Sequence, residues 1–287
     1  MSFTSMKDMI QRAGEESCTL WEIIRKEDML ERQVKKEESM EQMYSLFEAM
    51  KEADKSYNGN QRSLSGLSGG DGSKIQQAIQ KGIMISGDFI SKVMEGAIKM
   101  GESNACMKRI VAAPTAGSCG VLSSVLLAYD AFYHPTKEEI THALYMAAGI
   151  GDVISNRASI SGAKGGCQAE IGSASAMAAG AIAVLRDGTA TQICHSGAFA
   201  LKGLLGLVCD PIGGLVEVPC VKRNVIGAVN AITSTDLSIA GGESKVPFDE
   251  VIDAMAEIGE AMPCAYKETS QGGLAMTETG KHYETMK

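Results

Sequence analysis

The segment "PTKEEITHALYMAAGIGDVIS" (residues 135–155) gives the clearest signal of secondary structure in the chain. Pro135 precedes Thr136, and Glu139 follows three positions later, which is the pattern of a capping box. In this motif the threonine and glutamate side chains each satisfy a backbone N–H that the first helical turn leaves free. The segment therefore predicts a helix that begins directly after Thr136.

Helical patterns extend along most of the chain in both directions. Residues 73–83 and 86–103 have helical spacing, and "SCGVLSSVLLAYDAFY" (118–133) predicts a buried helix. Short runs such as "LVEVP" are the only hints of a strand, and no βαβ rhythm or repeat is present. The sequence therefore predicts an all-α fold with glycine-rich loops. Further helices are expected near residues 167–186, 190–206, 221–240 and 248–261.

The N-terminal part of the chain is more highly charged than the rest. Residues 1–57 predict one or two amphipathic helices, in which apolar residues such as Leu20 and Ile23 lie between pairs of Glu and Lys. Residues 58–73 follow and are too rich in glycine for a helix. We therefore expect a helical N-terminal region, 1–57, that packs on a single helical domain, 58–287, or on a partner.

The composition excludes several classes of protein. Of the 287 residues 45% are hydrophobic and 22% charged, which is typical of a globular protein. The net charge of −8 argues against a nucleic-acid partner, because phosphate binding requires clustered Lys and Arg. The N-terminus lacks the apolar segment of a signal peptide, and the longest uncharged stretch near the middle, 171–185, is too short to span a bilayer. We expect a cytoplasmic protein without a membrane segment.

Three of the eight cysteines stand in loops. Glycine or proline lies close to Cys167, Cys209 and Cys220 in "SGAKGGCQ" and "VCDPIGGLVEVPC", whereas four others lie in or near helical or apolar segments and Cys119 is intermediate. The paired C-x2-4-C knuckles of zinc sites are absent. The loop cysteines are equally consistent with ligands of an iron–sulfur cluster and with buried thiols. A 4Fe–4S cluster held by three thiolates keeps one iron open to act as a Lewis acid on a substrate.

Two glycine-rich stretches are candidates for binding an anion. "SLSGLSGGDG" (63–72) offers successive backbone N–H groups and hydroxyls, and "APTAGSCG" (113–120) leads into a helix start. The first stretch is equally consistent with a linker, and the second with an ordinary helix start. Lys164, Arg223, Asn224 and His195 lie next to or near cysteines and have the chemistry to bind a carboxylate or transfer a proton, although single Lys and His residues are more often structural or exposed.

These stretches closely resemble the alpha-subunit family of bacterial iron–sulfur-dependent L-serine dehydratases. The resemblance covers roughly residues 58–287, and its cysteine-bearing motifs are long and specific. The matching stretches are "SLSGLSGGDG", "APTAGSCGVLSSVL", "SGAKGGCQAEIGSASAMAAG", "GLVCDPIGGLVEVPCVKRN" and "KETSQGGLAMTETGK".

The resemblance implies an all-helical catalytic domain that holds a 4Fe–4S cluster through Cys167, Cys209 and Cys220. Such enzymes convert L-serine to pyruvate and ammonia without pyridoxal phosphate. Members occur fused to a small regulatory α/β domain or as separate alpha and beta subunits, and this chain resembles the separate alpha subunit. We therefore expect L-serine as substrate, a beta-subunit partner and an oligomer.

Substrate and catalytic residues are expected in the same motifs. The substrate-binding candidates are Ser65, Gly66, Ser68, Gly69, Gly70, Thr115, Ala116, Gly117, Arg223 and Asn224, and the candidates for proton transfer are Lys164 and His195. Other hypotheses remain open at this point. They are a cluster-dependent lyase for L-cysteine, threonine or another small hydroxy acid, a pyridoxal-phosphate enzyme with Lys164 as the Schiff-base lysine, and a helical subunit that senses oxygen without a substrate.

Overall fold

The structure is a computed structural model that describes residues 3–285, and it confirms the all-α prediction for those residues. It has thirteen α-helices, and the only β-type pairing in the described part is an isolated bridge between Cys209 and Lys267. The helices are α1 (Met6–Glu15), α2 (Leu20–Arg32), α3 (Lys36–Lys55), α4 (Asp71–Gln80), α5 (Gly87–Ala105), α6 (Cys119–Tyr133), α7 (Lys137–Arg157), α8 (Gly162–Gly165), α9 (Ser173–Leu185), α10 (Ala190–Lys202), α11 (Cys220–Ile239), α12 (Phe248–Ala261) and α13 (Glu278–Thr285). Short turns of 3-10 helix are η1 (Ala116–Ser118), η3 (Ile212–Gly214), η4 (Cys264–Tyr266) and η5 (Gly273–Met276), and η2 (Gln168–Gly172) is a π-helical turn.

The predicted start of α7 is confirmed in atomic detail. The Thr136 hydroxyl accepts from the Glu139 amide at 3.2 Å, and the Glu139 carboxylate accepts from the Thr136 amide at 2.6 Å. Thr189 and Gln192 form the same reciprocal cap at the start of α10. The capping chemistry therefore fixes where two of the long helices begin.

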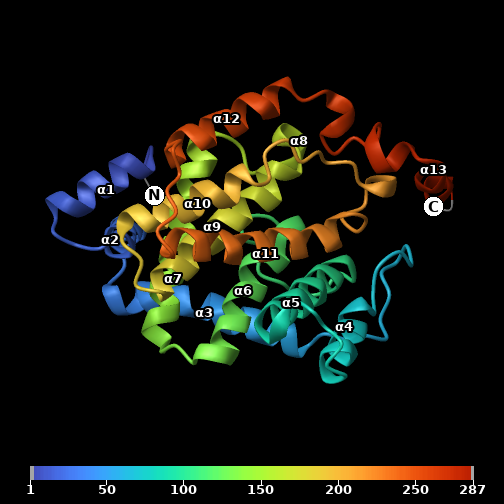
Figure 1. Cartoon of the computed structure of the whole chain (residues 1–287), viewed down its shortest axis with the longest axis horizontal. Helices are drawn as coiled ribbons and strands as arrows, with labels where there is room; N and C mark the ends of the chain where they lie inside the picture. Colours follow the sequence, from blue (N-terminus) through green and yellow to red (C-terminus); the bar gives the residue numbers. More distant parts are fainter. Residues whose placement is uncertain (1–2, 286–287) are drawn as a thin grey trace.

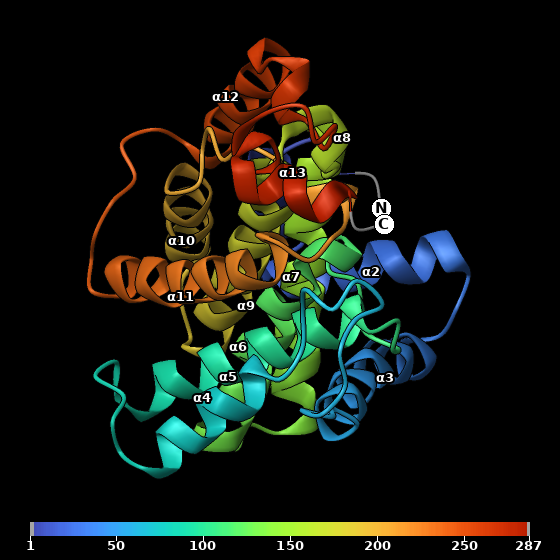
Figure 2. The same ribbon diagram turned by 90° about the vertical axis from the view of Figure 1, so that its right-hand side faces the viewer.

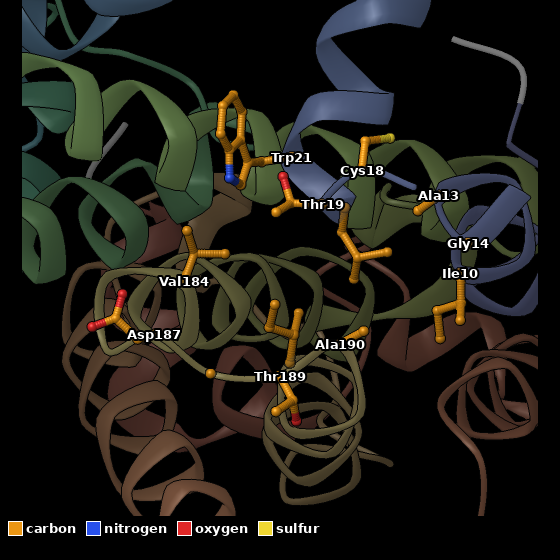
Figure 3. Close-up of a pocket in the computed structure, with 13 residues that line it drawn as sticks. Ile10, Ala13, Gly14, Cys18, Thr19, Trp21, Val184, Asp187, Thr189 and Ala190 are labelled. Carbon is orange, nitrogen blue, oxygen red and sulfur yellow. The ribbon is translucent and has the colours of Figure 1, made fainter. Parts of the chain in front are cut away.

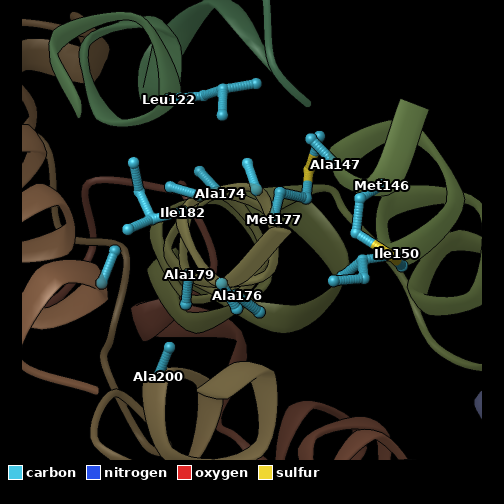
Figure 4. Packing of buried hydrophobic residues seen from close by; sticks show 14 of the residues in the cluster. Leu122, Met146, Ala147, Ile150, Ala174, Ala176, Met177, Ala179, Ile182 and Ala200 are labelled. Carbon is cyan, nitrogen blue, oxygen red and sulfur yellow. The ribbon is translucent and has the colours of Figure 1, made fainter. Parts of the chain in front are cut away.

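Helix α9 lies at the centre of the core. Figure 4 looks along this helix and shows Leu122 of α6, Ile150 of α7 and Ala200 of α10 on different sides of it. Its surface is made of small side chains such as Ala174 and Ala179, both fully buried, which allow neighbouring helices to approach closely. The stretch Gln168–Leu185 is apolar and long enough to cross a membrane, but 83% of it is buried inside the structure, as in a core helix.

The N-terminal helices share this core rather than forming a separate one. Side chains of α1 to α3, among them Met9, Ile24 and Phe47, belong to the same cluster of buried residues as those of α7. Ile24 packs so closely on Gly149 that a Cβ there would stand 2.4 Å from the isoleucine Cδ1. Residues 3–57 therefore pack on the rest of the chain, while the boundary after residue 57 stays a prediction.

A cavity of about 530 Å³ lies between the N-terminal helices and the α9–α10 connection (Figure 3). Ile10 and Trp21 face it from one side, and Val184 and Thr189 from the other. Its lining includes none of the three loop cysteines. This cavity is therefore distinct from the cysteine site.

Burial of His142, which stacks on Trp21 of α2, should make the free energy of unfolding depend on pH. The ring stacks on Trp21 with centroids 3.4 Å apart. Burial and then the charge of Arg25 lower the pKa of His142 from 6.5, although Glu138, Glu22 and Glu139 act in the opposite direction. Because the pKa of His142 is lower in the folded chain, the unfolded chain binds the imidazole proton at a higher pH. The free energy of unfolding should therefore fall as the pH decreases below about 6.5.

Urea unfolding between about pH 7.5 and pH 5 measures this effect, and the His142→Phe variant keeps the stacked ring but removes the titration. We expect the variant to lose less stability than the natural chain over this range. Equal losses for the two proteins would contradict the assignment.

Candidate cysteine centre

Segments that are far apart in the sequence gather at one end of the molecule. In Figure 1 the loop 58–70, the loop 207–219 and α13 lie at the end opposite α1 and α2. Figure 2 views this end directly and shows α13 in front of the other helices. The three loop cysteines lie in or beside these segments, and the structure shows how each is held.

Cys167 lies between α8 and the π-helical turn η2. Gly166, which precedes it, has a φ of 76°, and a Cβ there would stand 2.9 Å from the carbonyl oxygen of Leu207. Glycine is therefore required for the chain to turn into η2. Single π-helical turns inside α-helices are frequent at functional sites, and this one places Glu170 one turn after Cys167.

Gln168 joins the first cysteine segment to the second. Its side chain is fully buried, donates to the Met255 carbonyl at 3.1 Å and accepts from the Gly206 amide at 2.8 Å. Its backbone amide donates to the Leu207 carbonyl at 3.0 Å. These bonds fix the distance between Cys167 and the strand-like segment that carries Cys209.

The C-terminal segment holds Cys209 from its other side. The Cys209 amide donates to the Tyr266 carbonyl at 2.8 Å, and the Glu268 amide donates to the Cys209 carbonyl at 3.0 Å. Asp210 accepts from the Leu274 amide at 2.8 Å. The motif "KETSQGGLAMTETGK" therefore forms one wall of the cysteine loop.

Cys220 is the first residue of α11, and Asn224 fastens this helix to the turn 115–120. The Asn224 amide nitrogen donates to the carbonyls of Gly117 at 2.9 Å and Cys220 at 3.0 Å, and its oxygen accepts from the Gly120 amide at 2.9 Å. Asn224 is fully buried. The hydrogen bonds of its side chain therefore hold the first turn of α11 against the turn 115–120.

The two sulfurs of Cys167 and Cys209 converge with a carboxylate. Both cysteines are buried, and their sulfurs and an oxygen of Glu170 all lie within 4.8 Å of one another, a donor set that can hold a metal ion. A Cβ at Gly162 would stand 2.9 Å from Glu170 Oε2 and 3.3 Å from Cys209 Sγ, so glycine is needed at this position. A Cβ at Gly117 would stand 3.4 Å from Glu170 Oε1, which places the turn 115–117 beside the same carboxylate.

The third cysteine, Cys220, is near enough to Cys167 and Glu170 to feel their charges, but its sulfur is not part of the set within 4.8 Å. Burial raises the pKa of the Cys220 thiol to about 12, and the nearby charges of Cys167 and Glu170 add to this effect. Burial also raises the pKa of Glu170, against the hydrogen bond from Thr115. The site is thus a buried cluster of potential anions, which a cation must compensate if all are ionised.

Arg223 supplies positive charge at this point. Its guanidinium lies 3.4 Å from the Cys167 sulfur, donates to the Val208 carbonyl at 2.8 Å and pairs with Asp210 at 2.9 Å. The interaction with Cys209 and then the charge of Arg223 lower the pKa of Cys167, although burial opposes them. The interaction with Cys167 and burial raise the pKa of Cys209, so Cys167 is the thiol that ionises first.

The residues present fit an iron–sulfur cluster. Sulfur from Cys167 and Cys209 converges in a glycine-lined space, the buried Cys220 lies within range of their charges, and Arg223 is in contact with the Cys167 sulfur. All eight cysteines, which lie in the described part of the chain, are free thiols. The sulfur-rich donor set suits iron–sulfur chemistry better than Mg²⁺ or Ca²⁺, which prefer oxygen.

The described contacts of the two residues predicted for proton transfer are with other parts of the structure. Lys164 is exposed and lines a different cavity, of about 230 Å³, together with Met255 and Glu260. His195 accepts from the Ser244 amide at 3.2 Å and lies beside Phe199. Neither side chain has a described contact with the three loop cysteines.

The other predicted residues lie close to the centre or support it. Thr115, Ala116 and Gly117 form the turn η1 and its cap next to Glu170. The loop that carries Ser65, Gly66, Ser68, Gly69 and Gly70 reaches the segment between Cys209 and Cys220 through Glu217, to which Ser65 donates at 2.9 Å. Arg223 and Asn224 make hydrogen bonds to protein groups of the site, and their contact with the substrate stays a prediction.

The sequence interpretation missed two acidic residues at this site. Glu170 is the only charged residue between Lys164 and Arg186, and Glu217 the only one between Asp210 and Lys222. A lone acidic residue in an apolar, glycine-rich motif is a detectable signal, because burial of a charge requires a compensating partner.

Loss of Arg223 should destabilise the site measurably. Arg223→Ala leaves Asp210, whose side chain is only 5% exposed, without its cation. Removing one partner of a buried ion pair costs about 3–5 kcal/mol, so we expect a lower melting temperature and a smaller free energy of unfolding in urea. Lys245→Ala removes an exposed pair with Glu243 and should change the free energy of unfolding much less. Equal effects of the two substitutions would contradict the role given to Arg223.

Comparison with known proteins defines the class to which this fold and site belong. Residues 15–275 match the model of the family described as "Serine dehydratase alpha chain", and the chain is a member of that family. It is 44% identical to the "Probable L-serine dehydratase, alpha chain" of Bacillus subtilis, over 98% of this chain and 94% of the relative. It is 39% identical to the "L-serine dehydratase, alpha chain" of Peptoniphilus asaccharolyticus, over 96% and 94% respectively. The "L-serine dehydratase" of Haemophilus influenzae is 41% identical over 70% of this chain, which corresponds to 46% of that protein.

Proposed function

We propose that this chain is an L-serine ammonia-lyase, which converts L-serine to pyruvate and ammonia with a 4Fe–4S cluster and without pyridoxal phosphate. The observation that carries the proposal is the convergence of the buried Cys167 and Cys209 with the half-buried Glu170 within 4.8 Å, in a member of the serine dehydratase alpha-chain family. Cys220 completes the proposed ligand set. When bound, a cluster with three thiolate ligands supplies a Lewis-acidic iron that favours departure of a hydroxyl group.

The reaction removes the Cα proton and the β-hydroxyl of serine as water and gives 2-aminoacrylate, which tautomerises to an imine. Water then hydrolyses the imine to pyruvate and ammonia. We assign the acceptance of the Cα proton to Glu170, because its carboxylate lies against both sulfurs and next to the turn 115–117. We assign the binding of the substrate carboxylate to the backbone of that turn and of the loop 65–70.

Arg223 and the C-terminal segment position the thiols in this proposal. The guanidinium compensates thiolate charge at Cys167 and holds the cysteine loop through Val208. Because two relatives that match more than nine tenths of this chain are named alpha chains, we also propose a separate beta-chain partner, and we expect an oligomeric enzyme in the cytoplasm.

Anaerobic purification with iron and sulfide quantification, followed by a pyruvate assay, tests the proposal. We expect about four irons per chain and serine turnover that is lost on exposure to air. L-Cysteine and L-threonine are assayed in parallel with any beta chain present. Iron-free, air-stable activity would contradict the cluster, and turnover of cysteine without turnover of serine would contradict the substrate.

A further inference from the structure

Glu217 is a buried carboxylate outside the proposed chemistry, and it joins two motifs that are about 150 residues apart in the sequence. Only 7% of the residue is exposed. Ser63 donates to one of its oxygens at 2.6 Å, and Ser65 lies 2.9 Å from both oxygens. Hydrogen bonds to an ionised carboxylate are roughly twice as strong as neutral ones, so this contact is a strong link between the loop 63–70 and the cysteine loop.

The same two hydroxyls also define the shape of the serine–glycine loop. The Ser63 hydroxyl accepts from the Ser68 amide at 3.2 Å, and the Ser65 hydroxyl accepts from the Leu67 amide at 3.1 Å. The Ser63 amide in turn donates to the Ser68 carbonyl at 2.9 Å. Each serine hydroxyl thus accepts from a loop amide and donates to Glu217, so the bonds that shape the loop and the bonds that attach it to Glu217 share the same two hydroxyls.

Glu217 itself stands on the wall of the cysteine centre. Its carbonyl accepts from the Val221 amide at 2.9 Å, in the first turn of the helix that begins with Cys220. Its neighbour Val216 packs against Gly117, where a Cβ would stand 3.3 Å from the valine methyl. Through these contacts the position of the loop is tied to the turn next to Glu170.

A second set of contacts fixes the end of the loop. Asp71 forms ion pairs with Lys222 and Lys74. The amides of Asp71 and Gly72 donate to the buried Glu102 at 2.8 and 3.2 Å, so the start of α4 already has an anionic cap. The loop therefore has a fixed end at α4, while its tip depends on Glu217.

We propose that Glu217 is a positioning residue that holds the loop 63–70 over the cysteine centre and so sets the place of the substrate carboxylate. It does not contact the substrate. The Ser65 hydroxyl is committed to Glu217, so the backbone of the loop, not this hydroxyl, is the part available to the substrate. The expected change in KM for L-serine rests on the proposed function, whereas the expected change in amide exchange of the loop does not.

Hydrogen–deuterium exchange and kinetics of Glu217→Ala, Glu217→Gln and Ser65→Ala test this proposal. In the metal-free chain we expect amide exchange in residues 63–68 to accelerate about tenfold or more in Glu217→Ala, with a smaller effect in Glu217→Gln, because Gln keeps one acceptor oxygen. In the iron-loaded enzyme we expect KM for L-serine to rise about tenfold while kcat and iron content change little. Glu257→Ala, an exposed position on α12, is the matched control and should change none of these quantities.

Unchanged exchange in residues 63–68 would overturn the proposal, as would loss of iron in Glu217→Ala, which would make Glu217 a support of the thiols instead. If Glu217→Ala does not fold, Glu217→Gln and Ser65→Ala carry the exchange test. The effects of Ser65→Ala and Glu217→Ala on exchange should combine to less than their sum, because the two residues share one contact. If the natural iron-loaded chain does not turn over serine while Glu217→Ala still accelerates amide exchange in residues 63–68, the positioning role is supported and the proposed function is contradicted.

Discussion

Cys209→Ser should abolish both iron binding and lyase activity. Cys209 is buried, its sulfur lies within 4.8 Å of the Cys167 sulfur and a Glu170 oxygen, and both its backbone groups are bonded to the C-terminal segment. Serine is a hard, weakly acidic oxygen donor and replaces a thiolate poorly in an iron–sulfur site. We expect iron to fall from about four to below about one per chain, and kcat/KM for L-serine to fall by a factor of about 1,000 or more.

Two controls show whether Cys209 binds iron or only contributes to packing. Cys18→Ser, in the connection between α1 and α2, changes a half-buried free thiol and should leave the iron content unchanged. Circular dichroism and the melting temperature of the metal-free Cys209→Ser chain should remain close to those of the natural chain, because serine is nearly isosteric with cysteine. A Cys209→Ser enzyme with full iron content would remove this residue from the ligand set.

The fold was predictable from the sequence because capping and periodicity are local. Thr136 with Glu139 defines the start of α7, and "SCGVLSSVLLAYDAFY" corresponds to the buried helix α6. The packing of α1 and α2 on α7 was not predictable, since it depends on the fit of Ile24 against Gly149. Such a contact joins residues distant in the sequence and leaves no periodic signal.

The site was predictable only in part. Glycine and proline close to the three loop cysteines marked backbone that turns, which is a local property. The direction of a side chain is not local, so proximity to a cysteine in the sequence does not show whether Lys164 or His195 reaches the site, and the described contacts of both lie with other segments. Asn224 and Arg223 were expected at the substrate, but hydrogen bonds to distant carbonyls and to Asp210 engage them.

Glu170→Gln should lower kcat without lowering the iron content. The amide has almost the same shape as the carboxylate and can still accept from the Thr115 hydroxyl, so we expect the thiols to keep their places and the iron content to stay at about four per chain. An amide does not accept a proton from carbon. Loss of a proton acceptor typically costs a factor of about 100–10,000 in rate, so we expect kcat to fall by that factor with little change in KM.

The iron content decides between two roles for Glu170. Its oxygen and the two sulfurs form a group that can hold a metal, so a ligand role for the carboxylate predicts that Glu170→Gln loses iron together with activity. A proton-acceptor role predicts full iron, an unchanged visible spectrum and a much lower kcat. Glu257→Gln, on the exposed surface of α12, controls for the change in net charge and should match the natural enzyme in both measurements. Full iron and natural kcat in Glu170→Gln would exclude both roles and direct the search for the proton acceptor to the turn 115–117 or to the partner chain.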